Sequence, residues 1–102
     1  MEWYQYLASF FAGAFLANVV PHFVHGISGN KFPTPFAKPP GICLSSSTTN
    51  VVWALVNLVI GFLLFERGGV NSENVTSLTV FLAGISAISI MASINFRKKH
   101  KE

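Results

Sequence analysis

Two histidines, His22 and His25, lie three residues apart in an apolar stretch of this chain. Imidazoles at this spacing lie on one face of a helix and can share a ligand, and neutral imidazole binds zinc, copper or iron. A closed zinc site needs more ligands than a pair supplies, and only Cys43 and His100 remain, neither at ligand spacing. A second copy of the chain could complete such a site, so metal or haem binding is a minor alternative. Bonds from the two rings to loop carbonyls or lipid headgroups are the simpler interpretation, and we expect no cofactor.

Neutral polar residues recur at helical spacing in three apolar stretches of the sequence. The polar candidates are Asn18, His22, His25, Asn50, Asn57, Ser86, Ser89 and Ser93. Small residues form neighbouring rows, and these are Ser9, Gly13, Ala17, Ala54 and Gly61. In the structural interpretation, both kinds of residue let helices approach closely and hydrogen-bond to one another. In the functional alternative, the polar residues line a cavity or conduction path, and the amide of Asn57, in the middle of its stretch, is the most informative of them.

The sequence offers no candidates for catalysis. The apolar stretches contain no Asp or Glu, and no nucleophile is seen with a base and a third group to orient it. Proton and ion pathways through membranes also more often contain a carboxylate. The sequence therefore favours a protein that is not an enzyme.

The placement of the charged residues indicates which elements must carry these side chains. Hydrophobic residues make up 51% of the 102-residue chain and charged residues only 11%. No Asp, Glu, Lys or Arg occurs within residues 3–30, 39–65 or 74–96. Each interval is long enough for a transmembrane helix, which needs about 20 residues, whereas a water-soluble bundle would carry charges on one face of every helix. The sequence therefore predicts an all-α integral membrane protein with three transmembrane helices in one domain, residues 1–102.

The predicted spans cover about residues 3–24, 46–65 and 75–96, with a proline- and glycine-rich loop at 26–45 and a basic tail at 97–102.

Local signals predict where these helices begin and end. Pro21 is expected to kink the first helix or end it near Val20, because proline has no N–H to donate. The loop at 26–45 is expected to lack regular structure, and its apolar side chains are expected to rest on the membrane interface. The alternatives for the loop are a partly re-entrant segment or a surface that docks a partner. A run of serines and threonines would cap the second helix, and Asn71 or Ser72 the third.

Basic residues gather on one side of the predicted membrane. The first loop and the tail contain Lys31, Lys38, Arg97, Lys98, Lys99 and Lys101, whereas the second loop contains only Arg67. Basic residues in short loops stay in the cytoplasm. We therefore expect the amino terminus outside and the first loop and the tail inside. Because the basic residues follow the ends of apolar runs and form no patch with aromatic residues, we expect no nucleic-acid partner.

A distinctive stretch begins at residue 21 with the letters PHFVHGISG, followed by FPTPF at 32–36 and PPG at 39–41. It resembles a group of small uncharacterised bacterial inner-membrane proteins with three helices, and the similarity extends through residues 50–53 into the second span. The resemblance implies a bacterial inner-membrane location and carries no activity with it.

A weaker similarity, in topology, relates the chain to bacterial half-transporters of the SWEET family. Those proteins are homodimers with an outside amino terminus and a first helix that ends near a Pro-Gln pair. Here Pro21 and His22 stand at that place, and Trp53 and Asn57 lie on the second span. The similarity implies transport of a small solute by a dimer.

Two classes of function follow from these observations. The first is a small membrane protein that acts as an interaction or regulatory and structural subunit, with polar stripes as packing contacts and a membrane-protein partner at the apolar loop. The second is a transporter or channel for a small solute or ion, which requires an oligomer because three helices enclose little space. In both we expect contact with membrane lipid, self-association through the small-residue faces and location in the cell inner (plasma) membrane.

Overall fold

The computed structural model describes residues 2–37 and 43–98. It is mostly helical, and its three long helices are each long and apolar enough to cross a membrane, as a multi-pass membrane protein requires. The bundle measures 45 Å along its longest axis. Its elements are α1 (Trp3–Ile27), β1 (Phe32–Pro33), β2 (Leu44–Ser45), α2 (Ser47–Gly68), α3 (Val75–Asn95) and a 3-10 turn η1 (Phe96–Lys98).

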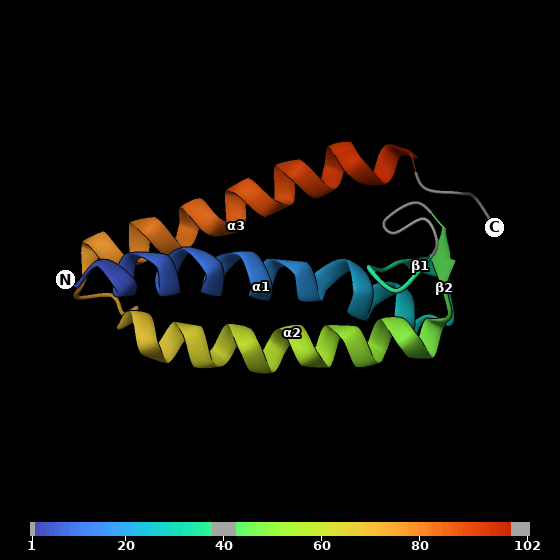
Figure 1. Ribbon diagram of the computed structural model, residues 1–102, viewed down its shortest axis with the longest axis horizontal. Helices are drawn as coiled ribbons and strands as arrows, with labels where there is room; N and C mark the ends of the chain where they lie inside the picture. The colour runs from blue at the N-terminus through green and yellow to red at the C-terminus, as the bar shows by residue number, and fades with distance from the viewer. Residues whose placement is uncertain (1, 38–42, 99–102) are drawn as a thin grey trace.

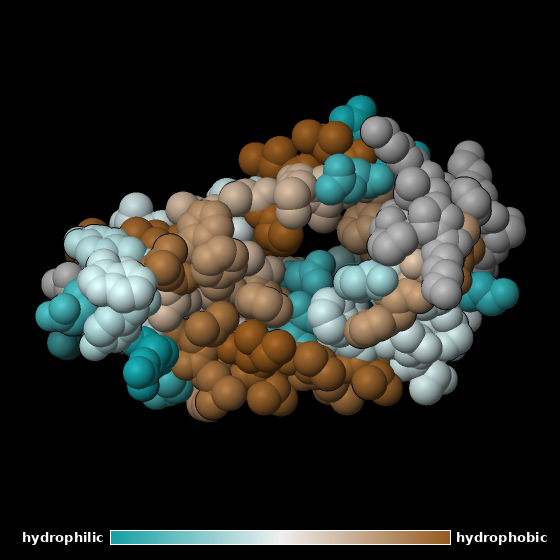
Figure 2. Space-filling view, in the orientation of Figure 1, coloured by the Kyte–Doolittle hydropathy of each residue, from teal (hydrophilic) through white to brown (hydrophobic). Residues whose placement is uncertain are grey.

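The central helix of the bundle is α1, which packs against both α2 and α3 (Figure 1). Close contact between the helices depends on small residues, because a Cβ at Gly84 of α3 would collide with the carbonyl oxygen of Phe10, and one at Gly13 with that of Phe81. On the other side of α1, Gly61 of α2 lies against the side chain of Leu16. The outer faces of the helices are apolar and exposed, as Figure 2 shows for α2 and α3. The helices therefore bury their small residues and present their large apolar ones outward, as lipid-facing helices do.

The first helix continues through Pro21 and ends at Ile27. It therefore does not end near Val20, and it reaches three residues beyond the predicted span. Proline removes only the hydrogen bond to the carbonyl of Ala17, four residues earlier, so the residues after it can keep their own partners. The last turns are also held by tertiary contacts, since the ring of His25 stacks on that of Phe32 with 4.4 Å between centroids.

The connection between α1 and α2 contains regular structure, contrary to the prediction for residues 26–45. Strands β1 and β2 pair antiparallel, with Phe32 opposite Ser45 and Pro33 opposite Leu44. The hydroxyl groups of Thr34 and Ser45 lie 2.5 Å apart and fasten the same ladder. Proline and glycine composition could not reveal this pairing, because side-chain bonds between distant residues stabilise it. The predicted features at 38–42 and at 99–102 lie outside the described residues.

Both later helices begin at a side-chain cap. Ser46 caps α2, where the N–H of Thr49 donates to its Oγ at 3.1 Å, and Gly69 ends the helix with a left-handed φ of 65°. For α3 the predicted caps, Asn71 and Ser72, are wrong. Asn74 caps that helix, since its side chain accepts the N–H of Ser77. The side chain of Asn71 instead accepts the N–H groups of residues 73 and 74 and forms the preceding turn.

The third helix separates from α1 toward its carboxyl end (Figure 1). In the middle of the helix, Gly84 allows close packing against α1, but the second half of α3 is mostly exposed. Contact returns at Phe96, whose ring lies 4.7 Å from that of Phe32. An open space therefore remains between the close contact at Gly84 and the contact at Phe96.

Candidate functional site

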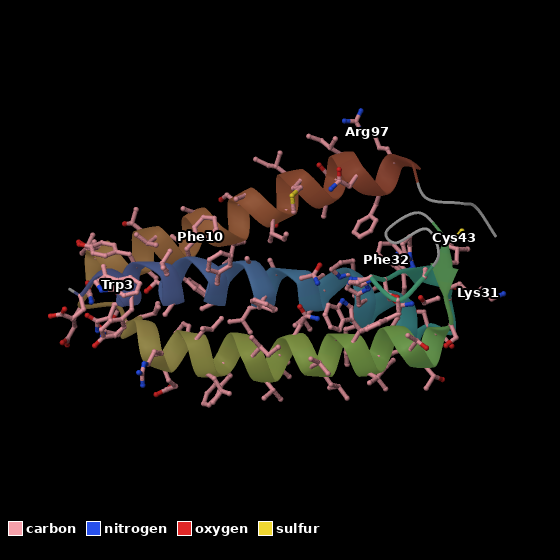
Figure 3. All side chains as sticks on the ribbon, in the orientation of Figure 1. Trp3, Phe10, Lys31, Phe32, Cys43 and Arg97 are labelled. Carbon is pink, nitrogen blue, oxygen red and sulfur yellow. The ribbon has the colours of Figure 1, made fainter. Side chains whose placement is uncertain are left out.

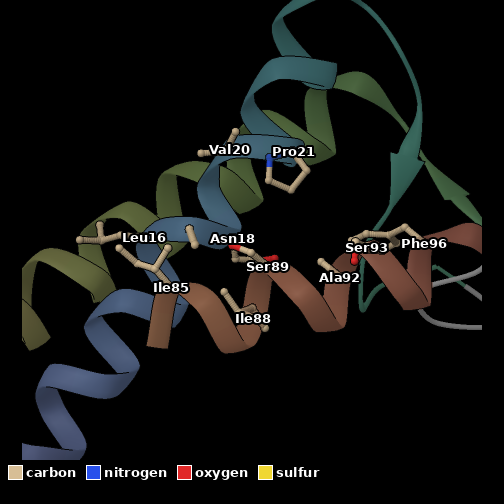
Figure 4. Close-up of a pocket in the computed structure, with 11 residues that line it drawn as sticks. Leu16, Asn18, Val20, Pro21, Ile85, Ile88, Ser89, Ala92, Ser93 and Phe96 are labelled. Atoms are coloured by element: carbon tan, nitrogen blue, oxygen red, sulfur yellow. The ribbon is translucent and has the colours of Figure 1, made fainter. Parts of the chain in front are cut away.

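The space between α1 and α3 is a cleft of about 600 Å³, which we call the α1–α3 cleft (Figure 4). Its walls are mostly apolar, and they include Leu16, Ala17, Pro21, Ile85, Ile88 and Ser89. A second hollow of about 300 Å³ adjoins it toward the β1–β2 loop and shares Asn18, Ala92 and Phe96 with it. We call this second space the polar hollow, because His22, Thr34 and Asn95 also line it. Figure 2 shows an opening between α3 and the rest of the chain, with hydrophilic residues at its floor.

The side chain of Asn50 connects the segments that surround the polar hollow. It is fully buried at the start of α2, and its Nδ2 group faces three backbone carbonyl oxygens, those of Phe32 (2.9 Å), Ser45 (3.3 Å) and Ser46 (3.0 Å). Carbonyl oxygens only accept hydrogen bonds, so the amide nitrogen of Asn50 must face them. Its Oδ1 atom then faces Nδ1 of His22, 2.7 Å away. This one side chain therefore joins α1, α2 and both strands.

The orientation of Asn50 determines which ring nitrogen of His22 carries the proton. Because Oδ1 can only accept, Nδ1 of His22 must be the donor. In the neutral ring, Nε2 is then an acceptor, and within the described residues it has no hydrogen-bond partner. The side chain is only 2% exposed, and it borders the polar hollow. His22 therefore offers one unused acceptor to whatever occupies that hollow.

The second histidine has a different environment. The ring of His25 lies nearly parallel to that of Phe32, with an angle of 13° between the planes, and His25 does not line the polar hollow. The two histidines share a helix side, but only His22 lines the polar hollow. Within residues 2–37 and 43–98, no group of three or more His, Cys, Asp or Glu side chains could hold a metal ion, and His100 lies outside those ranges.

The remaining asparagines form a second buried connection between α1 and α2. Nδ2 of Asn18 donates to Oδ1 of Asn57 at 3.2 Å, and Nδ2 of Asn57 donates to the carbonyl of Trp53 at 2.7 Å. Asn57 is almost completely buried, whereas Asn18 is half-buried and lines both cavities. The amide in the middle of α2 thus has its partner within the same chain.

The serines of α3 make no hydrogen bond to another helix in the described part of the chain. The hydroxyls of Ser86 and Ser93 donate to carbonyls of their own helix, at 2.9 and 2.7 Å. All three serines are exposed, but only Ser89 and Ser93 line the α1–α3 cleft. The structure therefore separates these predicted residues, since two face the cleft and Ser86 does not.

The predicted small residues lie mainly inside the chain. Ser9 is fully buried, and its hydroxyl donates to the carbonyl of Gly68 at 3.3 Å. Gly13, Ala54 and Gly61 are also buried between helices, whereas Ala17 lines the α1–α3 cleft. The rows that suggested contacts between copies are thus used for contacts within one copy.

Three residues at the cavities were not among the site residues predicted from the sequence. Thr34 is buried at the end of β1, Phe96 closes the cleft at the loop end, and Trp53 lines the polar hollow. The indole Nε1 atom of Trp53 is buried without a hydrogen-bond partner in the described residues, beside the ring of Phe36. Only the spacing of Trp53, one turn after Asn50 and one before Asn57, could have pointed to it.

No related protein adds information about the fold or the site. Comparison with protein-family models, with curated proteins and with solved structures finds no match to this chain.

Proposed function

We propose that this protein is a non-catalytic interaction subunit that resides in a membrane. We propose further that it binds an apolar molecule from the membrane, which enters the α1–α3 cleft laterally from the lipid. The observation that carries this proposal is the cleft itself, about 600 Å³ of mostly apolar space between two helices that face lipid. Ligand cavities typically measure about 300–1,000 Å³, and proteins are otherwise packed with few voids larger than a water molecule. Water is poorly bound in an apolar space, so an apolar molecule is the favoured occupant.

The size of the cleft favours a small molecule over a helix of a partner protein. A helix with its side chains is about 10 Å across and rises about 5.4 Å per turn, so one turn fills roughly 400 Å³. The cleft would hold little more than one such turn. A longer helix would also be blocked at both ends, where Gly84 and Phe96 bring α3 to the rest of the chain.

Binding is better supported than transport by the arrangement of the polar side chains. Asn50 bonds to His22, and Asn18 bonds to Asn57, so these amides are used as contacts between α1 and α2. A conduction path through one chain would need all of these groups to face an open route, whereas Asn50 and Asn57 line neither cavity. The transport hypothesis would require a second copy to build such a route.

For a bacterial inner-membrane protein, as the sequence resemblance implies, the charge distribution supports an orientation with the amino terminus outside. Lys31 and Arg97 lie at the end of the bundle opposite Trp3 (Figure 3). At the Trp3 end, Arg67 lies over the ring of Tyr4, 5.7 Å from its centre. By the rule that basic residues stay inside, the end with Lys31 and Arg97 faces the cytoplasm. Self-association stays a prediction, and it would have to use surfaces other than the buried small-residue rows.

The proposal is tested with an aliphatic probe that carries a photoreactive diazirine on a dodecane chain. Protein in lipid nanodiscs is labelled, and the adducts are located by mass spectrometry. We expect saturable labelling at Ile85 and Ile88, which unlabelled dodecane suppresses, against non-saturable labelling at the exposed residue Ile90.

A matched pair of variants controls this experiment. Ala92→Trp fills both cavities and should abolish the saturable labelling, whereas Ala87→Trp, on the exposed side of the same helix, should leave it. Labelling of the cleft that never saturates, or that survives Ala92→Trp, would contradict the proposed function.

A further inference from the structure

We propose that the ligand of the cleft is a neutral amphiphile with a hydroxyl head, which donates a hydrogen bond to Nε2 of His22 while its apolar tail lies between α1 and α3. The inference rests on the proposed function, uptake of an apolar molecule, and it specifies the chemistry of the head. It follows from the hydrogen-bonding character, the charge and the position of the groups that line the two cavities.

The polar hollow presents one unused acceptor, Nε2 of His22. Three carbonyls orient the amide of Asn50, the amide makes Nδ1 of His22 the donor, and Nε2 of the neutral ring is left as an acceptor. A charged ring would be costly in these mostly apolar surroundings, where none of the described lining residues is an Asp or Glu. Pro21 adds to the effect, because it cannot donate to the carbonyl of Ala17, and both residues line the cleft.

Unused acceptors select a ligand that donates. A hydroxyl group supplies one donor for Nε2, and its oxygen can accept from the amides of Asn18 or Asn95, which line the same hollow. A carbonyl or ether head offers only acceptors and would leave Nε2 facing another lone pair. Hydroxylated amphiphiles are therefore preferred over ketones, quinones and ethers of the same size.

The absence of charge at the site selects a neutral head. None of the described residues that line the cleft or the polar hollow is Asp, Glu, Lys or Arg. A phosphate or carboxylate would lose its hydration there and find no cation among the described lining residues, which is strongly unfavourable. Phospholipids and fatty acids are thus poor ligands, whereas long-chain alcohols fit.

The position of His22 along the helix matches the depth of a hydroxyl head. His22 lies five positions before the end of α1 at Ile27, a distance of about 8 Å along the helix axis. That end of the bundle also carries Lys31 and Arg97 and so lies toward the membrane surface (Figure 3). The apolar part of the cleft, at Leu16 and Ile85, lies deeper. A tail that enters between the helices would therefore place its head beside His22.

The test compares two competitors that differ in one donor. Displacement of the diazirine–dodecane probe is measured with 1-dodecanol and with 1-methoxydodecane, in nanodiscs at matched mole fractions. We expect the alcohol to compete about three- to tenfold better than the ether, as one hydrogen bond would produce. Equal competition by the two compounds would overturn this inference and leave the proposed function standing. Failure of any compound to compete would instead refute the proposed function.

The variant His22→Asn assigns the preference to Nε2. An asparagine amide can place its nitrogen near the position of Nδ1 and keep the bond to Asn50, but it has no atom at the position of Nε2. The variant should bind both competitors equally, whereas Ala87→Leu should keep the preference. A preference that persists in a folded His22→Asn protein would overturn the proposal.

A measurement on the unaltered protein covers the case in which His22→Asn does not fold. In the neutral ring, the ¹⁵N chemical shift of Nε2 should respond to added 1-dodecanol and not to 1-methoxydodecane. An Nε2 signal that neither compound moves would likewise overturn the assignment of His22 as the acceptor.

Discussion

Replacing Asn50 by leucine should destabilise the protein more than any other single change at a polar residue of its helices. The amide is fully buried and provides the partner of Nδ1 of His22 as well as bonds to the carbonyls of Phe32 and Ser45. The two carbonyls remain paired in the β1–β2 ladder, and that of Ser46 keeps the backbone N–H of residue 50. The N–H of His22, in contrast, would have no partner.

The magnitude follows from this difference. A buried donor left without a partner costs about 1–3 kcal/mol, and each lost bond between satisfied groups costs about 0.5–1.5 kcal/mol. Asn50→Leu loses one partner of a buried donor and two bonds between satisfied groups, and should therefore lower the free energy of unfolding by about 2–6 kcal/mol. Asn57→Leu is the matched control, because its partner Asn18 is half-buried and can turn to the cleft. It should cost about 1 kcal/mol or less, as hydrogen bonds between membrane helices typically do.

Unfolding by sodium dodecyl sulfate in mixed micelles, followed by circular dichroism, measures both variants. Hydrogen exchange adds a local readout, because the N–H of Phe36 donates to Thr34 in the loop that Asn50 holds. Asn50→Leu should unfold at a lower detergent fraction than Asn57→Leu and should expose the Phe36 amide. Equal stability of the two variants would show that the hydrogen bonds of Asn50 do not hold the loop on the helices.

Three further predictions concern helix packing, capping and the tautomer. Gly84→Ala should lower the free energy of unfolding by about 1–3 kcal/mol, because the added Cβ forces α1 and α3 apart. Ala87→Leu, on the exposed side of α3, should change it little. Equal effects of the two substitutions would contradict the close approach of the helices. In the same assay, Asn74→Ala should lower the free energy of unfolding by about 1 kcal/mol, because it removes the cap of α3. Ser72→Ala should leave the free energy of unfolding almost unchanged. The reverse order would show that Ser72, as expected from the sequence, is the cap. The ¹⁵N chemical shifts of His22 should show the proton on Nδ1 and a bare Nε2, and the opposite tautomer would refute the orientation derived for Asn50.

Much of the helical framework could be predicted, whereas much of the connection between helices could not. Each charge-free interval that is long enough to span a bilayer indicates one transmembrane helix, because burial in lipid depends on composition. The three such intervals in this sequence correspond to the three long helices. The path of α1 past Pro21 and the pairing of β1 with β2 depend instead on bonds between residues far apart in sequence. Asn50, for example, reaches residues at the end of α1 and in both strands. No periodicity in the sequence records such contacts.

The same distinction applies to the candidate site. Because polar side chains in an apolar helix need partners, spacing alone predicted a polar path or interhelical contacts at Asn18, His22, His25, Asn50, Asn57, Ser86, Ser89 and Ser93. The structure brings together Asn18 with Asn57 and His22 with Asn50, whereas the three serines of α3 are exposed. The amino-acid sequence thus determined the helical class and the set of polar residues. Only the tertiary structure decided that Asn50 uses its amide on the loop, that His22 keeps a free Nε2, and that α3 leaves a cleft beside it. The reason is physical: apolarity acts on each residue by itself, whereas hydrogen bonds and cavities depend on where distant residues meet.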